Sequence, residues 1–187
     1  MAGTEEILER IRSGLLNRNP FLVAIDGPCG SGKSTLARSL QKEIPAVILP
    51  MDDFFLPKEM RTKERLSLPG ENVDHERFLK EVLLPLSQGK DFSYSPYDCH
   101  KDAMGERKSF SPHGLFLIEG SYSFHPDLLP FYDLKIFVTV SKEEQRRRLQ
   151  ERERERFPMF EQRWIPLEEK YFQKCDPRSQ ADLIVTE

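Results

Sequence analysis

The sequence has few cysteines, little net charge and no long apolar run. Only three cysteines occur in 187 residues, and they are widely separated, so neither a disulfide framework nor a cysteine-rich metal site is expected. The net charge of −3 provides no bulk attraction to nucleic acid or to an anionic membrane. No stretch approaches the roughly 18 apolar residues that a membrane-spanning helix needs. These absences favour a reduced, cytoplasmic protein whose partners are small molecules.

The order of the apolar segments predicts one α/β domain covering residues 1–187. Short apolar runs typical of buried parallel strands alternate with segments of helical periodicity. The expected strands are 21–25, 46–49, 115–118, 134–140 and 182–185. The expected helices are 4–16, 34–43, one that begins after Asp74 and ends at Gly89, 142–156, and about 159–175, while the proline-rich residues 91–113 are expected to be irregular. We therefore expect a five-stranded parallel sheet with helices on both faces.

A glycine-rich motif directly follows the first predicted strand. Residues 27–34 match G-x-x-x-x-G-K-[ST], with the apolar run 21–25 before them and the helix-like segment 34–40 after them. Glycines let the backbone fold around an anion, Lys33 can reach the β- and γ-phosphate oxygens, and the Ser34 hydroxyl can ligate Mg²⁺. The motif predicts a P-loop NTPase fold that binds a nucleoside triphosphate. The residues expected to bind the nucleotide are Gly27, Gly30, Ser31, Gly32, Lys33, Ser34 and Thr35.

Two carboxylates follow the second predicted strand. Asp52 and Asp53 come about nineteen residues after Lys33, where a strand beside the first one would end near the γ-phosphate. A carboxylate there can accept a proton from an attacking hydroxyl, hold Mg²⁺, or do both. An Asp pair in a turn or at a helix cap is the other interpretation. The apolar strand before the pair and the two phenylalanines after it favour the catalytic role.

Glu119 ends a predicted strand that is otherwise apolar. A lone carboxylate is costly to bury without a partner, and a divalent ion opposite Ser34 would supply one. A structural ion pair with a lysine or arginine is the alternative.

Several short motifs, taken in order, resemble those of one kinase group. Beyond the phosphate loop they are Asp52-Asp53-Phe54-Phe55, Glu71-Asn72-Val73-Asp74-His75, Pro96-Tyr97-Asp98, Ile118-Glu119-Gly120 and residues 133–138. Each is short, and their shared order and spacing carry the similarity. The chain resembles the uridine kinase and phosphoribulokinase group of P-loop kinases, and residues 52–55 also resemble nicotinamide riboside kinases. The resemblance implies Mg²⁺-dependent transfer of the γ-phosphoryl group of ATP to a hydroxyl of a nucleoside-like acceptor.

The resemblance also implies roles for individual carboxylates. Asp52 corresponds to the catalytic carboxylate near the acceptor hydroxyl. Glu119 is expected to support Mg²⁺, together with Ser34 and Asp52. Asp74 corresponds to the aspartate that grips sugar hydroxyls, and Asp53 is a further candidate for the acceptor side. Asp74 is also a suitable N-cap for the helix that follows it, and the two roles are compatible.

The chain departs from the family pattern at the expected base contact. Family members usually continue Tyr-Asp-Phe with a histidine five residues after the tyrosine, whereas this chain reads Tyr97-Asp98-Cys99-His100-Lys101-Asp102. Tyr97 is the candidate that would lie against the acceptor base. His100 could substitute for the family histidine or be a surface-loop residue. The resemblance therefore does not specify uridine as the acceptor.

Residues 145–156 carry six arginines and three glutamates. Glu–Arg pairs on a solvated helix explain part of this run, at only ~0.2–0.5 kcal/mol each. In the family the corresponding helices form a lid over ATP, expected here at about 142–175, and guanidinium groups suit phosphoryl oxygens. One or two of Arg148, Arg152 and Arg156 are expected to contact phosphate, and Arg148 and Arg152 are the catalytic candidates.

Two other functions remain open from the sequence. One is a kinase for a non-nucleoside metabolite, such as a pantothenate-like or phosphosugar compound. The other is a nucleotide-dependent regulatory switch with slow hydrolysis, which would need a GTP-specifying Asn-Lys-x-Asp, and no such motif occurs. The expected cofactors are ATP and Mg²⁺, and the expected partners are ATP and a small hydroxyl acceptor, without nucleic acid or membrane.

Overall fold

The core of the fold is a parallel sheet formed by the predicted apolar runs. The computed structural model describes residues 2–99 and 101–186. Five strands lie in the order β2-β7-β1-β8-β9, and every neighbouring pair is parallel. Their bounds are β1 Phe21–Asp26, β2 Ala46–Pro50, β7 Leu115–Glu119, β8 Leu134–Thr139 and β9 Leu183–Thr186. The predicted α/β fold class and five-stranded parallel sheet are confirmed.

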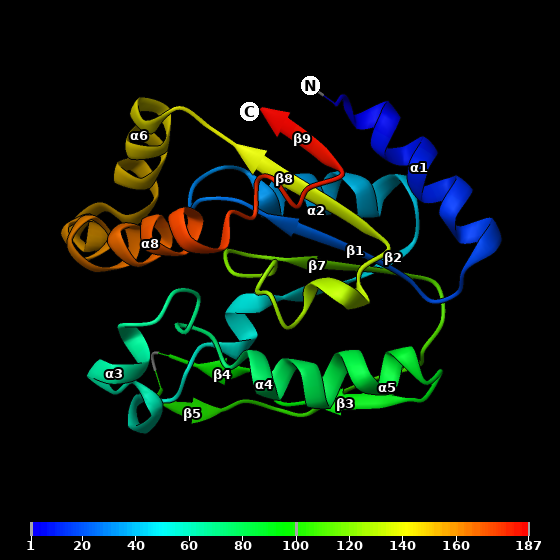
Figure 1. The fold of residues 1–187 in the computed structure, drawn as a ribbon, viewed down its shortest axis with the longest axis horizontal. Helices are drawn as coiled ribbons and strands as arrows, with labels where there is room; N and C mark the ends of the chain where they lie inside the picture. Colours follow the sequence, from blue (N-terminus) through cyan, green and yellow to red (C-terminus); the bar gives the residue numbers. More distant parts are fainter. Residues whose placement is uncertain (1, 100, 187) are drawn as a thin grey trace.

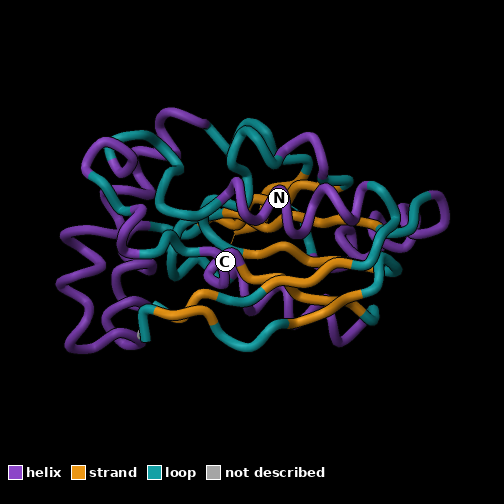
Figure 2. Tube along the Cα trace, turned by 90° about the horizontal axis from the view of Figure 1, so that it is seen from below, coloured by secondary structure: helices purple, strands orange, loops and turns teal. Residues whose placement is uncertain are grey.

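Helices cover both faces of the sheet, as Figures 1 and 2 show. One face is covered by α1 (Thr4–Asn17) and α2 (Lys33–Glu43). The other is covered by α4 (His75–Phe78), a π-helical turn over Leu79–Leu83, α5 (Leu84–Ser87) and α8 (Ile165–Cys175). The remaining helices are α3 (Lys63–Leu66), α6 (Lys142–Glu153) and α7 (Phe157–Met159). None of the helices in residues 2–99 and 101–186 is long and apolar enough to cross a membrane.

Strand β1 is buried on both sides and connects two hydrophobic clusters. Successive side chains of a strand point to opposite faces, so Leu22 and Ala24 join one cluster while Val23 and Ile25 join the other. Because both faces are covered, the strand is apolar throughout instead of alternating. This explains why the sequence pattern was a continuous run.

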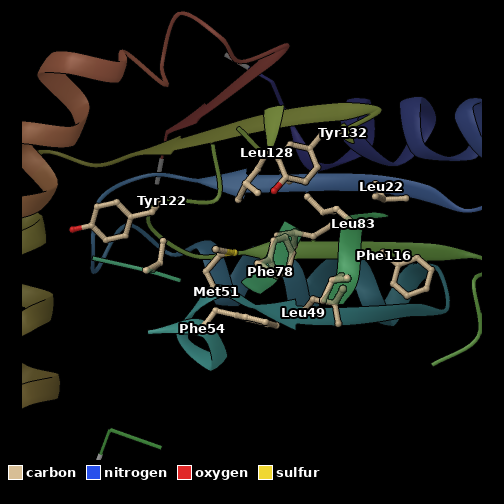
Figure 3. Close-up of a cluster of buried hydrophobic side chains, with 14 of the residues drawn as sticks. Leu22, Leu49, Met51, Phe54, Phe78, Leu83, Phe116, Tyr122, Leu128 and Tyr132 are labelled. Carbon is tan, nitrogen blue, oxygen red and sulfur yellow. The ribbon is translucent and has the colours of Figure 1, made fainter. Parts of the chain in front are cut away.

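The first cluster also positions the segment that follows β2. Met51 and Phe54 belong to a short 3₁₀ turn, Met51–Phe54, and both are fully buried. Figure 3 shows Met51 and Phe54 near Phe78 of α4, and all three belong to the first cluster. Two buried anchors fix the turn, and Asp52 and Asp53 lie between them in the chain.

Two regions differ from the expectation. Residues 91–113 are not irregular: β3 (Phe92–Tyr94) pairs with β6 (Lys108–Phe110), and β4 (Tyr97–Asp98) pairs with β5 (Ala103–Met104), both antiparallel. Phe92 and Tyr94 are buried at alternate positions, and this alternation was the overlooked strand signal. The helix expected over 142–156 ends at Glu153, because Arg154 has a positive φ of 49°.

Candidate active site

The phosphate loop joins β1 to α2 with three glycines in left-handed or otherwise glycine-favouring backbone conformations. Gly27, Gly30 and Gly32 have φ values of 145°, 75° and 102°. A Cβ atom at Gly27 would lie 2.1 Å from the carbonyl oxygen of Val138, so only glycine fits there. Helix α2 begins at Lys33 without a side-chain cap or an acidic residue in its first turn. The first-turn N–H groups and the positive end of the helix dipole are thus available to an anion.

Asp26, the last residue of β1, holds the start of this loop through buried hydrogen bonds. Its side chain is fully buried, and its two oxygens accept hydrogen bonds from the Gly27 N–H at 2.6 Å, the Phe124 N–H at 2.8 Å and the Tyr171 hydroxyl at 2.8 Å. Burial raises the pKa of the Asp26 carboxyl to about 6, against the opposing effect of these hydrogen bonds and of Lys33. The residue ties the loop to the segment after β7 and to helix α8.

Lys33 is nearly buried within the loop. Its ammonium donates hydrogen bonds to the Gly27 carbonyl at 2.8 Å, the Pro28 carbonyl at 2.9 Å and the Ser121 hydroxyl at 3.4 Å. Only 7% of the residue is exposed. The lysine predicted to bind phosphate therefore lies at the loop and is oriented by neutral acceptors. Among residues 2–99 and 101–186, no carboxylate forms a direct ion pair with it.

Two residues that sequence reasoning missed organise the surroundings of Lys33. Glu168, 5% exposed on α8, accepts hydrogen bonds from the Cys29 N–H at 2.9 Å and from the Ser121 hydroxyl at 2.6 Å. Ser121 also lies 3.1 Å from the Gly27 carbonyl oxygen. The available signal was a single acidic residue on the buried face of α8, three positions before the buried Tyr171.

Ser34 and Glu119 lie together, as the sequence predicted. The Ser34 hydroxyl donates a hydrogen bond of 2.9 Å to Glu119 at the end of β7. Loss of hydration raises the pKa of the Glu119 carboxyl; the Ser34 hydrogen bond opposes this shift, and the negative charge of Asp52 adds to it. A hydroxyl and a carboxylate, with a second carboxylate in electrostatic range, are the hard oxygen donors that Mg²⁺ prefers. The chemistry of these donors fits the expected ion.

Asp52 lies within electrostatic range of the phosphate loop and of the lid. Its side chain can be reached by solvent but is surrounded by protein atoms, and the resulting loss of hydration raises its pKa. The positive charges of Lys33 and Arg152 oppose that shift, and the negative charges of Asp53 and Glu168 add to it. A carboxylate in such a mixed environment is suited to proton transfer.

Asp53 is held more firmly than its neighbour. One carboxylate oxygen accepts hydrogen bonds from the Tyr94 hydroxyl at 2.8 Å and from Lys108 at 3.0 Å, and its backbone carbonyl accepts one from Arg77 at 2.9 Å. These contacts join the 3₁₀ turn to the β3–β6 ribbon and to α4. Asp53 therefore has a structural role, and its predicted contact with the acceptor stays a prediction.

Asp74 caps α4, as expected from its position. Its carboxylate accepts a hydrogen bond of 3.0 Å from the Arg77 N–H, and the Arg77 side chain lies 3.6 Å from its other oxygen. The Asp74 N–H also donates to the Phe54 carbonyl at 2.7 Å, which brings the cap beside the turn that carries Asp52. With 7% of the residue exposed, its role toward a sugar stays a prediction.

The expected base-contact residues are less favourably placed. Tyr97 is only 6% exposed, and its hydroxyl donates to Asp102 within the β4–β5 ribbon. Strand β4 packs against the 3₁₀ turn that carries Asp52, so Tyr97 lies near the proposed acceptor site. Its ring is largely buried, so it is not exposed for stacking against a base. His100 lies outside the described residues.

The lid arginines differ in their partners. Arg148 pairs with Glu144 at 2.7 Å and reaches toward the Gly30 carbonyl at 3.5 Å, so it is beside the phosphate loop. Arg152 and Arg156 both pair with Glu153. The positive charge of Arg152 opposes the rise in the pKa of Asp52. Arg148 therefore lies beside the phosphate loop and Arg152 lies in electrostatic range of Asp52, and their predicted contacts with phosphate stay predictions.

Comparison with known proteins finds kinases. No protein-family model matches the chain. A uridine kinase of Ureaplasma parvum is 27% identical over 139 residues, which are 68% of this chain and 66% of that protein, so the match spans just under two thirds of the relative's length. A uridine kinase of Alkaliphilus metalliredigens is 27% identical over 191 residues, 92% of this chain and 89% of that protein. Nicotinamide riboside kinase 1 of Homo sapiens is 30% identical over 138 residues, 68% of this chain and 63% of that protein.

Solved structures of low sequence identity share the fold. The structure of a possible uridine kinase from Bacillus stearothermophilus has a TM-score of 0.69 and 20% identity, covering 96% of this chain and 99% of that one. The D-glycerate 3-kinase of Cryptococcus neoformans has a TM-score of 0.56 and 15% identity, covering 90% and 89%. The predicted resemblance is therefore confirmed: this chain is similar in sequence to uridine kinases and nicotinamide riboside kinases, and it has the P-loop kinase fold.

Proposed function

We propose that this protein transfers the γ-phosphoryl group of ATP, with Mg²⁺, to a hydroxyl of a nucleoside-like small molecule. The observation that carries this proposal is that β2, which Asp52 follows by two residues, pairs with β7, whose last residue Glu119 lies opposite Pro50 and accepts a hydrogen bond of 2.9 Å from Ser34 of the phosphate loop. A triphosphate site and a candidate proton acceptor thus share one edge of the sheet. The names of the uridine kinase and nicotinamide riboside kinase relatives support the same class of acceptor.

The residues of the phosphate loop would bind and orient the triphosphate. The N–H groups at the start of α2 and the Lys33 ammonium would contact the β- and γ-phosphate oxygens. Ser34, Glu119 and Asp52 are the residues that would hold Mg²⁺, and that ion when bound neutralises phosphate charge. Glu168 and Ser121 would keep the loop and Lys33 in place through the hydrogen bonds described above.

Asp52 would act on the acceptor. Phosphoryl transfer has a loose transition state, so the main requirement is an acceptor hydroxyl held in line and a group that takes its proton. The raised pKa of Asp52 brings its proton affinity closer to that needed of a general base. Asp53, in the same turn, and Asp74, whose N–H donates to the Phe54 carbonyl of that turn, would orient the remainder of the acceptor.

The lid would contribute positive charge and exclude water. Arg148 and Arg152, on α6, would contact phosphoryl oxygens in the closed complex, where a guanidinium can donate two parallel hydrogen bonds. Closure of such segments commonly accompanies phosphoryl transfer, because it removes competing water from the site.

The proposal also includes a cytoplasmic location with no nucleic acid or membrane partner. Cys29, Cys99 and Cys175 are all free thiols, which suits a reducing compartment. ATP and the small acceptor are the only partners that the proposed reaction requires.

A second candidate is an anionic acceptor, such as a phosphosugar or a pantothenate-like acid. The hydrogen bonds of the Arg61 guanidinium are with neutral groups, the Leu56 carbonyl at 2.7 Å and the Cys99 thiol at 3.6 Å. Burial raises the pKa of the Cys99 thiol and the charge of Asp52 adds to that effect, so Cys99, the hydrogen-bond partner of Arg61, is in electrostatic range of the proposed base. A guanidinium in this position favours a carboxylate or phosphate on the acceptor.

The test is ADP release from ATP and Mg²⁺ with a panel of ribonucleosides, their 2′-deoxy analogues, phosphosugars and pantothenate. The proposal predicts release that requires a ribonucleoside, with kcat/KM about tenfold to somewhat over a hundredfold lower for its deoxy analogue, because an acceptor group is left unpaired. Asp74→Ser keeps the helix cap while removing the carboxylate, so it should abolish the ribose preference without unfolding the protein.

The other outcomes separate the candidates. The second candidate would replace the nucleoside assignment if ADP release required an anionic acceptor. In that case Arg61→Gln should raise KM for that acceptor with little change in kcat. Release that is the same with and without every acceptor would contradict both kinase proposals and favour a nucleotide-hydrolysing switch.

A further inference from the structure

Two histidines and a glutamate meet at a place that the proposed reaction does not use. Glu71 precedes α4, His75 is its first residue, and His125 follows β7 by six residues. One ligand atom from each lies within 4.8 Å of the others. Two segments therefore converge on a small volume, one that holds Glu71 and His75 and one that holds His125, 50 positions after His75. The sequence analysis did not identify this cluster, because no local pattern relates His125 to residues 71–75.

The imidazoles present the same nitrogen to the same carboxylate oxygen. Glu71 Oε1 lies 3.1 Å from His75 Nε2 and 3.9 Å from His125 Nε2. Ligand atoms bound at about 2.0–2.1 Å to a tetrahedral metal ion are roughly 3.3 Å apart, so a contraction on the order of 1 Å would complete such a site. A stacked pair that served packing alone would not require both Nε2 atoms to face one oxygen.

Charged neighbours hold these groups in orientation. The other oxygen of Glu71 pairs with Arg65 at 3.0 Å, which directs Oε1 toward the histidines. On the opposite side of the rings, Asp127 Oδ2 lies 3.3 Å from His75 Nδ1 and 3.9 Å from His125 Nδ1, where it can accept the Nδ1 proton of His75. A carboxylate that accepts this proton commonly orients a metal-binding histidine. The Asp127 N–H donates to His125 Nδ1 at 3.3 Å, and metal binding through Nε2 of His125 would replace this contact, because Nδ1 would then carry the ring proton.

Both imidazoles are nearly buried. Their side chains are 6% and 8% exposed, and that of Glu71 is 18% exposed. The rings stack with centroids 3.7 Å apart and planes inclined by 17°. A nitrogen lone pair lies in the ring plane, so the two rings would have to fan apart to direct both lone pairs at one ion.

We propose that Glu71, His75 and His125 bind one divalent transition-metal ion, with Zn²⁺ as the best match. Two imidazoles and one carboxylate suit Zn²⁺ and leave a position for water, whereas Mg²⁺ prefers oxygen ligands only. The ion would tie the segment that carries Asp74 to the loop after β7 that carries Ser121. Binding to the folded chain alone would raise its thermal unfolding midpoint.

The test is titration of the full chain with Co²⁺ in excess Mg²⁺, followed by its d–d absorption and then by displacement with Zn²⁺. One ion should bind, with a four- or five-coordinate spectrum and no thiolate charge-transfer band. Glu71→Gln and His125→Asn should weaken binding at least a hundredfold. Asp127→Asn should weaken it by about tenfold to a hundredfold, as expected for a residue that orients ligands.

His113→Ala is the matched control, because His113 is an exposed histidine outside the cluster. Binding in this variant should equal that of wild type. Metal-free unfolding midpoints would identify any variant that fails to fold, and X-ray absorption of the Zn²⁺-loaded wild type reports the ligands without any substitution. No one-to-one complex, equal affinity in Glu71→Gln and His113→Ala, or sulfur ligation would each overturn the proposal.

Discussion

The carboxylate of Glu168 on α8 accepts a hydrogen bond of 2.9 Å from the backbone N–H of Cys29 in the phosphate loop. The other oxygen accepts one from the Ser121 hydroxyl, which in turn contacts Lys33. The last helix of the lid is therefore joined directly to the loop expected to bind phosphate. A carboxylate so deeply buried is stabilised only as long as both donors remain in place.

Glu168→Gln should reduce both stability and turnover. The amide cannot accept at both positions, so about 1–3 kcal/mol of unfolding free energy should be lost, and kcat should fall because the loop is less well ordered. Glu169→Gln is the matched control, since Glu169 is half exposed and pairs with Lys142 on the surface. Urea unfolding and ADP release of the two variants check this. Equal behaviour of the two would show that the Glu168 contact does not order the loop.

Asp52→Asn should lower kcat by about 10²–10⁴, the usual contribution of general-base assistance, with ATP affinity largely retained. Asp53→Asn should lower kcat less, because the Asp53 carboxylate is engaged by Tyr94 and Lys108. Asp53→Asn should instead reduce stability. Steady-state kinetics and nucleotide titration measure kcat and ATP affinity of the two variants, and urea unfolding measures the stability of Asp53→Asn. A larger kcat loss in Asp53→Asn would assign the base to that residue.

Arg148→Ala should lower kcat by on the order of 10²–10³, as expected when one group that stabilises transition-state charge is removed. Arg147→Ala should change kcat by less than about threefold. Arg147 is exposed and pairs with Glu144 and Glu151, and such pairs contribute little. Comparison of the two neighbouring arginines tests which face of α6 closes over the nucleotide. A larger kcat loss in Arg147→Ala than in Arg148→Ala would mean that the face of α6 that carries Arg147 closes over the nucleotide.

Features that depend on neighbouring residues in the chain were predictable. The five strands were recognisable because strands covered on both faces are continuously apolar, and the phosphate loop because its glycines are required by its own backbone. The Asp74 cap was predictable for the same reason, since it bonds to a residue three positions away. One contact between distant segments was predictable: Ser34 and Glu119 are 85 positions apart, but the phosphate-loop motif and the end of an apolar strand placed both at the same edge of the sheet. The contact between Glu168 and Cys29, 139 positions apart, was not predictable, because no motif or local pattern relates these two residues.

Asp26 should contribute to the pH dependence of the unfolding free energy. Burial raises its folded-state pKa to about 6 from 3.8, so the folded chain binds this proton more tightly than the unfolded chain. The contribution to the unfolding free energy is therefore greatest below pH 3.8, falls as the pH rises toward about 6, and is constant above that. Urea unfolding of wild type and Asp26→Asn between pH 3.5 and about 8 isolates it, because other groups are common to both proteins. If the unfolding free energy of wild type, relative to that of Asp26→Asn, increased with pH over this window, the raised pKa of Asp26 would be contradicted.

The most direct test follows the label of [γ-³²P]ATP during turnover of wild type and Lys33→Ala with a ribonucleoside acceptor. The account predicts that the label appears on the nucleoside in wild type, that little appears as inorganic phosphate, and that Lys33→Ala nearly abolishes transfer because the charge on the phosphate oxygens is no longer neutralised. Label released only as inorganic phosphate whatever acceptor is present, or transfer by Lys33→Ala at the wild-type rate, would contradict the assignment of this protein as a P-loop small-molecule kinase.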